Sequence, residues 1–182
     1  AAADLAQFIR ALQRIDTTGG PRAGAHNSFR GVPLRMRDDR TRDAIGRLTD
    51  VLDTAAITAV WEAALEVPDW EGAPVWIHGD LQAGNLLARD GRLSAVIDFG
   101  CLGVGDPAGE LIAAWHLFRG ESRAVFRAEM GVDAATWARG RGWALSVSLV
   151  ALPYYQTTNP ALADQSRRTI EAVMRDVREH GA

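Results

Sequence analysis

The stretch WIHGDLQAGNLLARDGRLSAVIDFG, residues 76–100, decides the fold. Two apolar-rich segments within it, 86–89 and 92–97, flank Asp90-Gly91. Asp-Gly between such segments is the strongest short-range signal for a two-residue hairpin turn. We therefore predict an antiparallel hairpin here. A short buried strand is predicted just before it, at Val75-Trp76-Ile77.

Polar residues occupy set positions around this hairpin. His78-Gly79-Asp80 precedes it, Asn85 lies between this tripeptide and the first strand, and Asp98-Phe99-Gly100 follows the second strand. If the hairpin has a two-residue turn, Asn85 opposes Val96, and strand alternation places Asp98 on the same face as Asn85. Their Cβ atoms would lie roughly 7–8 Å apart on the diagonal. Both side chains could then reach a shared Mg²⁺.

This combination resembles the catalytic core of the aminoglycoside phosphotransferase and choline kinase superfamily, which is protein-kinase-like. In that superfamily the catalytic-loop motif reads His-Gly-Asp, as at 78–80 here. Residues 76–118 carry the resemblance, including Gly105-Asp106-Pro107-Ala108, and the rest of the chain fits more loosely. The resemblance implies an α+β, mostly helical fold: the C-terminal lobe of a kinase-like protein, with a small β-hairpin that carries the metal ligands.

The resemblance also implies a role for each motif residue. Asp80 is expected to be the catalytic base, and His78, in the same catalytic motif, is expected to brace the loop. Asn85 and Asp98 are expected to bind Mg²⁺, with ATP or GTP as the phosphate donor. Glu110 stands where relatives usually place an aspartate that binds the catalytic-loop backbone. We therefore expect its carboxylate to accept hydrogen bonds from the loop.

Three positions depart from the superfamily pattern. Gln82-Ala83 replaces a common His-Pro, which alters the stiffness of the loop but no catalytic group. Cys101 stands where many relatives carry aspartate. Glu110 has one methylene more than the usual aspartate, which affects where the loop is held.

Helical periodicity prevails outside the central strands. A first amphipathic helix is predicted to end near Ile15, and residues 16–39, rich in glycine and proline, are predicted to form a long loop. Cap and proline signals mark helix starts at Asp106-Pro107 and Asn159-Pro160. A second helix is predicted around Ile45–Leu52, and a third is predicted to begin after a cap at Asp53 or Thr54. The helix that begins at Asp106-Pro107 is predicted to end at about Phe118, with Gly120 just beyond it. Two more helices are predicted at 121–130 and 133–151.

Composition narrows the class of protein. The chain has 182 residues with 47% hydrophobic and 24% charged residues, which is typical of one globular domain. A single cysteine excludes an internal disulfide and fits a reducing compartment. No signal-peptide pattern or spanning apolar stretch is evident, so a cytoplasmic location with no membrane partner is expected. The net charge of −3 argues against a nucleic-acid partner.

The parts that hold nucleotide phosphates are not found in the sequence. All 20 positive side chains are arginine, and no Gly-x-Gly-x-x-Gly precedes His78. Kinases need a glycine-rich loop and a lysine for these phosphates. We therefore expect residues 1–182 to form a single catalytic and substrate-binding lobe that lacks its N-terminal nucleotide-binding lobe and is inactive alone. Apolar surface left by that lobe could support a homodimer.

The leading hypothesis is ATP-dependent transfer of the γ-phosphate to a hydroxyl of a small polar molecule. The net negative charge favours an amine-rich acceptor, such as an aminoglycoside in antibiotic resistance. The alternative is a non-catalytic binding or regulatory module that retains the kinase-like fold. A further rival is a metal-dependent hydrolase that uses His78, Asp80 and Asp98, although no second histidine stands at ligand spacing.

Overall fold

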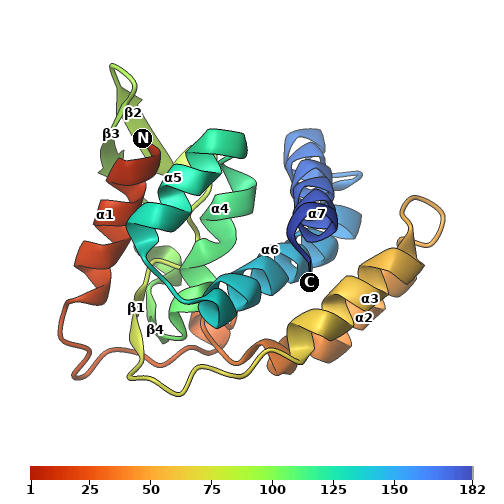
Figure 1. Cartoon of the computed structure of the whole chain (residues 1–182), viewed down its shortest axis with the longest axis horizontal. Coiled ribbons are helices and arrows are strands. Elements are labelled where there is room, and N and C mark those ends of the chain that lie inside the picture. The colour runs from red at the N-terminus through yellow and green to blue at the C-terminus, as the bar shows by residue number, and fades with distance from the viewer. Residues whose placement is uncertain (182) are drawn as a thin grey trace.

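The computed structural model describes residues 1–181 and consists mainly of helices with two small antiparallel sheets (Figure 1). In chain order the elements are α1 (Ala2–Gln13), η1 (Ala25–Asn27), η2 (Leu34–Arg37), α2 (Asp38–Gly46), α3 (Thr54–Leu65), β1 (Val75–Ile77), η3 (Ala83–Asn85), β2 (Leu86–Arg89), β3 (Arg92–Val96), η4 (Phe99–Cys101), β4 (Gly103–Gly105), η5 (Pro107–Ile112), α4 (Ala113–His116), α5 (Gly120–Met130), α6 (Ala134–Tyr155) and α7 (Pro160–His180).

Helix α6 is the centre of the molecule. It packs against α7, α2, α3 and η5, while α1 packs against α5 and β1 on the other side (Figure 1). The core around α6 includes two fully buried tryptophans, Trp61 of α3 and Trp143 of α6. Burying aromatic side chains of this size contributes strongly to folding, because the hydrophobic gain grows with the apolar area removed from water.

Side-chain caps begin the helices where the sequence predicted them. Asp53 accepts a hydrogen bond from Ala56 N, and Asn159 accepts one from Leu162 N. Asp106 accepts one from Ala108 N, with Pro107 at the first helical position. Each cap provides an acceptor for an amide that has no partner within its helix.

Three helix predictions need correction. Helix α2 spans Asp38–Gly46 rather than the region around Ile45–Leu52: Ile45 lies in its last turn, whereas Leu48 packs into the core from the turn that follows. The helix that starts at Pro107 is 3₁₀ up to Ile112 and α-helical only at Ala113–His116. Gly120 begins α5 instead of following a helix end.

The hairpin is present, but its register differs from the prediction. Arg89 opposes Arg92 as expected, whereas Leu86, not Asn85, opposes Val96. The cause is a bulge: Leu87 and Ala88 pair with Ala95 and Leu93, which leaves Ser94 as an extra residue in β3. The strand alternation that was used to place Asn85 and Asp98 on one face therefore does not apply.

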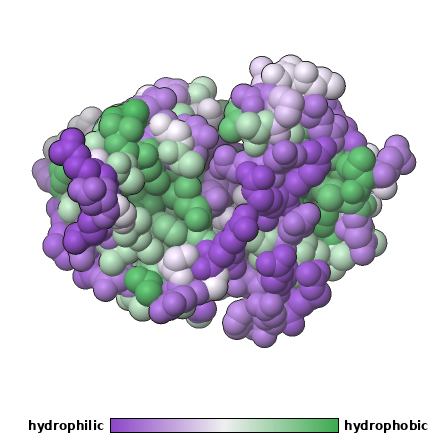
Figure 2. All heavy atoms as spheres, turned by 90° about the horizontal axis from the view of Figure 1, so that it is seen from above, coloured by the Kyte–Doolittle hydropathy of each residue, from purple (hydrophilic) through white to green (hydrophobic). Residues whose placement is uncertain are grey.

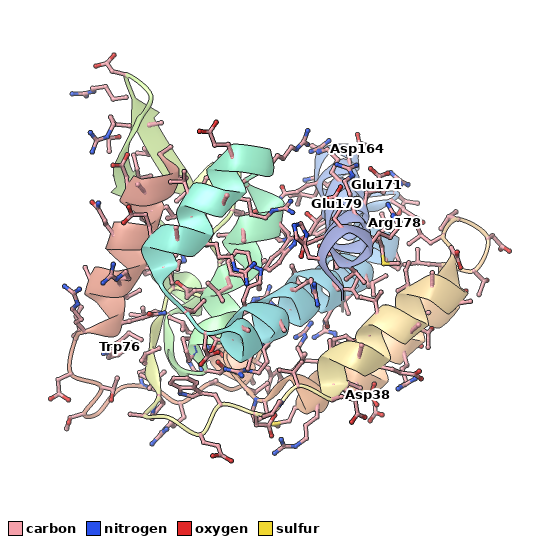
Figure 3. The ribbon with its side chains drawn as sticks, in the orientation of Figure 1. Asp38, Trp76, Asp164, Glu171, Arg178 and Glu179 are labelled. Atoms are coloured by element: carbon pink, nitrogen blue, oxygen red, sulfur yellow. The ribbon has the colours of Figure 1, made fainter. Side chains whose placement is uncertain are left out.

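A second sheet holds the start of the catalytic loop. Strand β1 pairs antiparallel with β4, a strand that the sequence did not predict. Trp76 of β1 also donates through Nε1 to Asp16 O at 2.9 Å, so the loop after α1 is tied to this sheet (Figure 3). The segment that enters the loop is thus held on both sides.

Helix α1 holds the hairpin through one carboxylate. Asp4 accepts hydrogen bonds from Arg92 Nε and Nη2 and from Leu93 N. The side-chain hydrogen bond from Arg92 keeps the pKa of Asp4 well below its usual range. The contact sets the position of the hairpin relative to the helical part of the molecule.

Some large apolar side chains are exposed near the hairpin, among them Leu87, Ile97 and Phe99. Figure 2 shows apolar surface gathered in separate areas of one face, with polar residues between them. The expected homodimer stays a prediction. None of the helices within residues 1–181 combines the length and apolar character needed to span a membrane.

Candidate active site

His78 is fully buried between the catalytic loop and the end of the hairpin. Its Nδ1 accepts a hydrogen bond from Asp80 N at 3.2 Å, so Nε2 carries the proton that is donated to Ile97 O at 3.0 Å. The Phe99 ring packs on the imidazole with centroids 4.7 Å apart. Burial lowers the pKa of His78, which favours the neutral ring.

This arrangement suits the bracing role expected of His78. Both ring nitrogens are engaged within the protein, so neither has a lone pair left for a metal ion. The metal-dependent hydrolase considered above would need that lone pair, and the geometry therefore argues against it.

The glycine of the His-Gly-Asp motif is required by the backbone. Gly79 has φ of +81°, a conformation that residues with a side chain rarely adopt. A Cβ atom placed there would lie 2.5 Å from the carbonyl oxygen of Cys101. Only glycine lets the loop pass this close to the chain that follows the hairpin.

Asp80 lies at the edge of a pocket, and its side chain is held from one side. Its Oδ2 accepts hydrogen bonds from Gln82 Nε2 and Asn85 Nδ2, both at 3.0 Å. The Asn85 amide also donates to Asp80 O at 2.8 Å. Within residues 1–181, Asp80 Oδ1 has no hydrogen-bond donor and is available to a ligand.

The residues expected to bind metal are placed by turns rather than by strand alternation. Asn85 is the last residue of η3 and is nearly buried. Its side-chain nitrogen Nδ2 donates to Asp80, so Oδ1 is the atom that could bind a metal ion. Asp98 is exposed in a left-handed conformation with φ of +62°, and its Oδ1 accepts from Gly100 N at 3.3 Å. Carboxylate and amide oxygens are suitable ligands for Mg²⁺.

The structure brings some of these residues together directly. Asn85 contacts Asp80 through Nδ2, and Asp98 directly follows Ile97, whose carbonyl oxygen accepts a hydrogen bond from His78 Nε2. Asn85 and Asp98 share no hydrogen bond within the described chain. Their joint binding of Mg²⁺ stays a prediction, as does the catalytic role of Asp80.

The contact expected of Glu110 is present. Gly79 N donates to Glu110 Oε1 at 2.8 Å, while the buried Oε2 has no hydrogen-bond partner within residues 1–181. Burial raises the pKa of Glu110 to about 7, although the hydrogen bond from Gly79 acts in the opposite direction. The longer side chain thus still reaches the loop. Its importance for catalysis stays a prediction.

We expect the Glu110→Gln variant to alter the pH dependence of stability. The raised pKa means that the folded protein binds this proton more tightly than the unfolded chain does. Wild-type stability is therefore lost as pH rises from about 4.5 to about 7. Glutamine keeps an acceptor for Gly79 N and does not titrate, so the variant should gain about 3 kcal/mol relative to the wild type across this window.

Urea denaturation of both proteins at several pH values measures this difference. The matched control is Glu171→Gln, which removes a carboxylate exposed on the outer side of α7 (Figure 3). A stability difference between Glu110→Gln and the wild type that does not change with pH would contradict the prediction.

A pocket of about 450 Å³ opens beside Asp80. The catalytic loop and Glu110 line one wall, and residues of α6 and α7 line the other. His116 faces it and contacts Ser148 Oγ through Nε2 at 3.3 Å, and burial lowers its pKa to about 4. At neutral pH this imidazole is uncharged. The volume falls within the range of small-molecule sites.

Among the pocket residues that sequence reasoning missed are three arginines, Arg30, Arg37 and Arg40. They come from the glycine- and proline-rich loop and the first turn of α2, where charged residues are usually solvated. No local pattern distinguishes them from the other arginines of the chain, because only tertiary packing places them at the pocket.

A family model described as the phosphotransferase enzyme family matches residues 1–143. No curated protein sequence gives a significant match. Solved structures do match. The gentamicin complex of the enzyme APH(2'')-IIa is 22% identical, with a TM-score of 0.55 over 95% of this chain and 62% of that one.

Two other structures extend the comparison. The GDP and kanamycin complex of APH(2'')-IIIa is 19% identical, with a TM-score of 0.67 over 98% of this chain and 62% of that one. The macrolide 2'-phosphotransferase MphH from Brachybacterium faecium is 20% identical, with a TM-score of 0.58 over 94% of this chain and 58% of that one. At these identities the likeness shows the fold, and the chain spans about 60% of the length of these structures.

Proposed function

Because the chain belongs to the phosphotransferase enzyme family, we propose that it is the acceptor-binding and catalytic lobe of a nucleotide-dependent phosphotransferase that phosphorylates a hydroxyl of a small molecule. The observation that carries the proposal is the Asp80 carboxylate. It borders a small-molecule pocket with one oxygen held by Gln82 and Asn85 and the other available to a ligand.

In this proposal Asp80 orients the acceptor hydroxyl and accepts its proton as the phosphoryl group is transferred. The hydrogen bonds from Gln82 and Asn85 fix the carboxylate before the acceptor arrives, so less entropy is lost when the acceptor binds. His78 and Glu110 hold the loop backbone on either side of Gly79. The loop is therefore positioned by buried contacts rather than by the acceptor.

Asn85, through Oδ1, and Asp98, through its carboxylate, would hold Mg²⁺. When bound, this ion neutralises charge on the donor phosphates. Two protein ligands, one of them a neutral amide, make a weak site by themselves, because Mg²⁺ takes its other ligands from water and phosphates. The donor, ATP or GTP, would be held by an N-terminal lobe that precedes this chain in the intact protein.

An assay with and without such a lobe tests the proposal. We expect no turnover from residues 1–182 alone with Mg²⁺ and either ATP or GTP. We expect robust turnover once a nucleotide-binding lobe precedes Ala1. Release of ADP or GDP against a panel of hydroxylated acceptors is the measurement, and Mg²⁺ removal by chelation should abolish it.

Two results would contradict this expectation. Turnover by the chain alone would show that the phosphates need no second lobe. Absence of turnover by the extended protein with every acceptor would favour the non-catalytic binding module. The aminoglycoside acceptor expected from the sequence followed from the superfamily resemblance, with the net charge of the whole chain as added support. The charges at the pocket itself favour another class.

A further inference from the structure

We propose that the pocket beside Asp80 takes an acceptor alcohol that also carries a negatively charged group, a carboxylate or a phosphate, which the pocket arginines bind. The proposal rests on the proposed function and deepens it by naming the class of acceptor.

Arg37 is the central observation. Its side chain is only 4% exposed, and it lines the pocket from η2. Nε donates to Ser146 Oγ at 2.8 Å, and the guanidinium lies over the Trp143 ring, 4.7 Å from its centroid. Neither partner carries a negative charge. A buried cation without a counter-charge is costly, so its place at a pocket indicates an anion that comes from outside.

The neighbouring arginines of the pocket also form no ion pair in the part of the chain that the structure describes. Within residues 1–181, neither Arg30, Arg37 nor Arg40 forms an ion pair. Nearby arginines that face away from the pocket are different: Arg35 pairs with Asp69, and Arg42 pairs with Asp38 and Glu62. Arginines without an ion pair also occur elsewhere in the described chain, but those, such as Arg14 and Arg168, are exposed to solvent, whereas Arg37 is buried.

Arg30 links the group of pocket arginines to the catalytic loop. Its Nε donates to Gly79 O at 2.9 Å, and the negative charge of Asp80 acts on its guanidinium. Arg40, exposed at the other end of the group, is free to move toward a ligand. The planar guanidinium fork matches the geometry of carboxylate and phosphate, which are the anions that arginine binds in pairs of hydrogen bonds.

Negative charge at the pocket does not cancel these arginines. The acidic residues in its lining are Asp80 and Glu110. Glu110 is directed to Gly79 N, and burial raises its pKa to about 7, so part of the population is neutral near pH 7. The lining therefore has a net positive charge. A polycationic acceptor would meet repulsion there, whereas an anionic acceptor would be attracted.

The lining residues on the opposite wall of the pocket indicate what the rest of the acceptor is like. Besides polar residues such as Ser148, this wall has apolar and aromatic residues of α6 and α7, including Val147, Val150, Tyr154 and Leu162. An apolar body could pack there while the anion meets the arginines and the hydroxyl meets Asp80.

Binding of three probes that share a hydroxyl and a phenyl group tests the proposal. These are 3-phenyllactate, its neutral amide, and the cationic 1-amino-3-phenylpropan-2-ol. Calorimetric titration of this chain should give an affinity for the carboxylate about tenfold or more above that for the amide. The amine and kanamycin should bind more weakly still. Comparing 3-phenyllactate with the 1-phosphate of 3-phenylpropane-1,2-diol shows whether the pocket prefers a carboxylate or a phosphate. Tight binding of either compound supports the proposal.

Variants test whether the arginines cause the preference. Arg40→Gln and Arg37→Gln should each lower carboxylate affinity about tenfold while leaving amide affinity unchanged. Arg40 is exposed, so its variant remains informative even if loss of buried Arg37 impairs folding. The matched control is Arg47→Gln, which removes an exposed arginine of the same region that pairs with Asp43 away from the pocket.

Several outcomes would overturn the proposal: no detectable binding of the carboxylate, equal affinity for carboxylate and amide, tighter binding of the amine or kanamycin, or a charge preference that survives both variants. The results that would overturn the anionic acceptor differ from those that would overturn the proposed phosphotransferase function. Phosphorylation of a neutral or cationic alcohol by the extended protein would leave that function standing. Anion binding without turnover by the extended protein would remove the function and keep the anion site.

Discussion

Replacement of Asp80 by alanine is expected to lower the turnover of the intact enzyme by about 10²–10⁴, the share that a positioned general base contributes. The alanine variant loses the oxygen that faces the pocket and the oxygen that Gln82 and Asn85 hold. The acceptor hydroxyl would then have no group to orient it or to take its proton. The loop should keep its backbone conformation, because His78 and Glu110 bind main-chain groups that remain.

Steady-state kinetics of the intact protein measure this effect. The loss should be in kcat, with little change in KM for the nucleotide, because Asp80 is expected to act on the acceptor. Asp43→Ala, which removes an exposed carboxylate of α2, is the matched control. An Asp80→Ala variant that retains more than about a tenth of wild-type kcat would show that another group serves as the base.

Replacement of Asp106 by alanine is expected to destabilise the fold by about 3–5 kcal/mol. Asp106 and Arg139 form a buried ion pair, 5% and 3% exposed, with Nε and Oδ2 2.8 Å apart. The same carboxylate caps η5 by accepting from Ala108 N. Alanine would leave the guanidinium buried without its counter-charge and the helix start without its acceptor. Both losses act in the folded state.

Chemical denaturation compares this variant with Asp164→Ala, which breaks the exposed pair between Asp164 and Arg167. Exposed pairs contribute little, so the control should change the free energy of unfolding by less than about 1 kcal/mol. An Asp106→Ala variant as stable as the control would mean that Arg139 finds sufficient partners in Pro68 O and Thr136 Oγ1, which it also contacts.

The elements that depend on short-range chemistry were predicted correctly. Asp90-Gly91 specifies a hairpin because its turn needs residues that tolerate positive φ, and both have it, at +51° and +74°. Caps at Asp53, Asp106 and Asn159 follow from carboxylate and amide side chains that satisfy the first amides of a helix. The resemblance carried by the same region predicted the family and the kinase-like fold, which the comparisons confirm.

Features that depend on distant parts of the chain were not predicted. The bulge at Ser94 changed the register of the hairpin beyond the turn, and no residue pattern in the strands marked it. Strand β4 was missed because its three residues become a strand only when β1 lies beside them. A local pattern carries no information about such partners.

The charge of the pocket shows most clearly the difference between what the sequence predicts and what tertiary packing decides. The sequence alone indicates a net charge of −3 and twenty arginines, and that sum favoured a cationic acceptor. The tertiary structure pairs some of those arginines with carboxylates elsewhere and leaves Arg30, Arg37 and Arg40 at the pocket without an ion pair to any described residue. A ligand responds to the charges within about a Debye length, roughly 8 Å at physiological ionic strength. Folding, and not composition, therefore sets the charge that an acceptor meets.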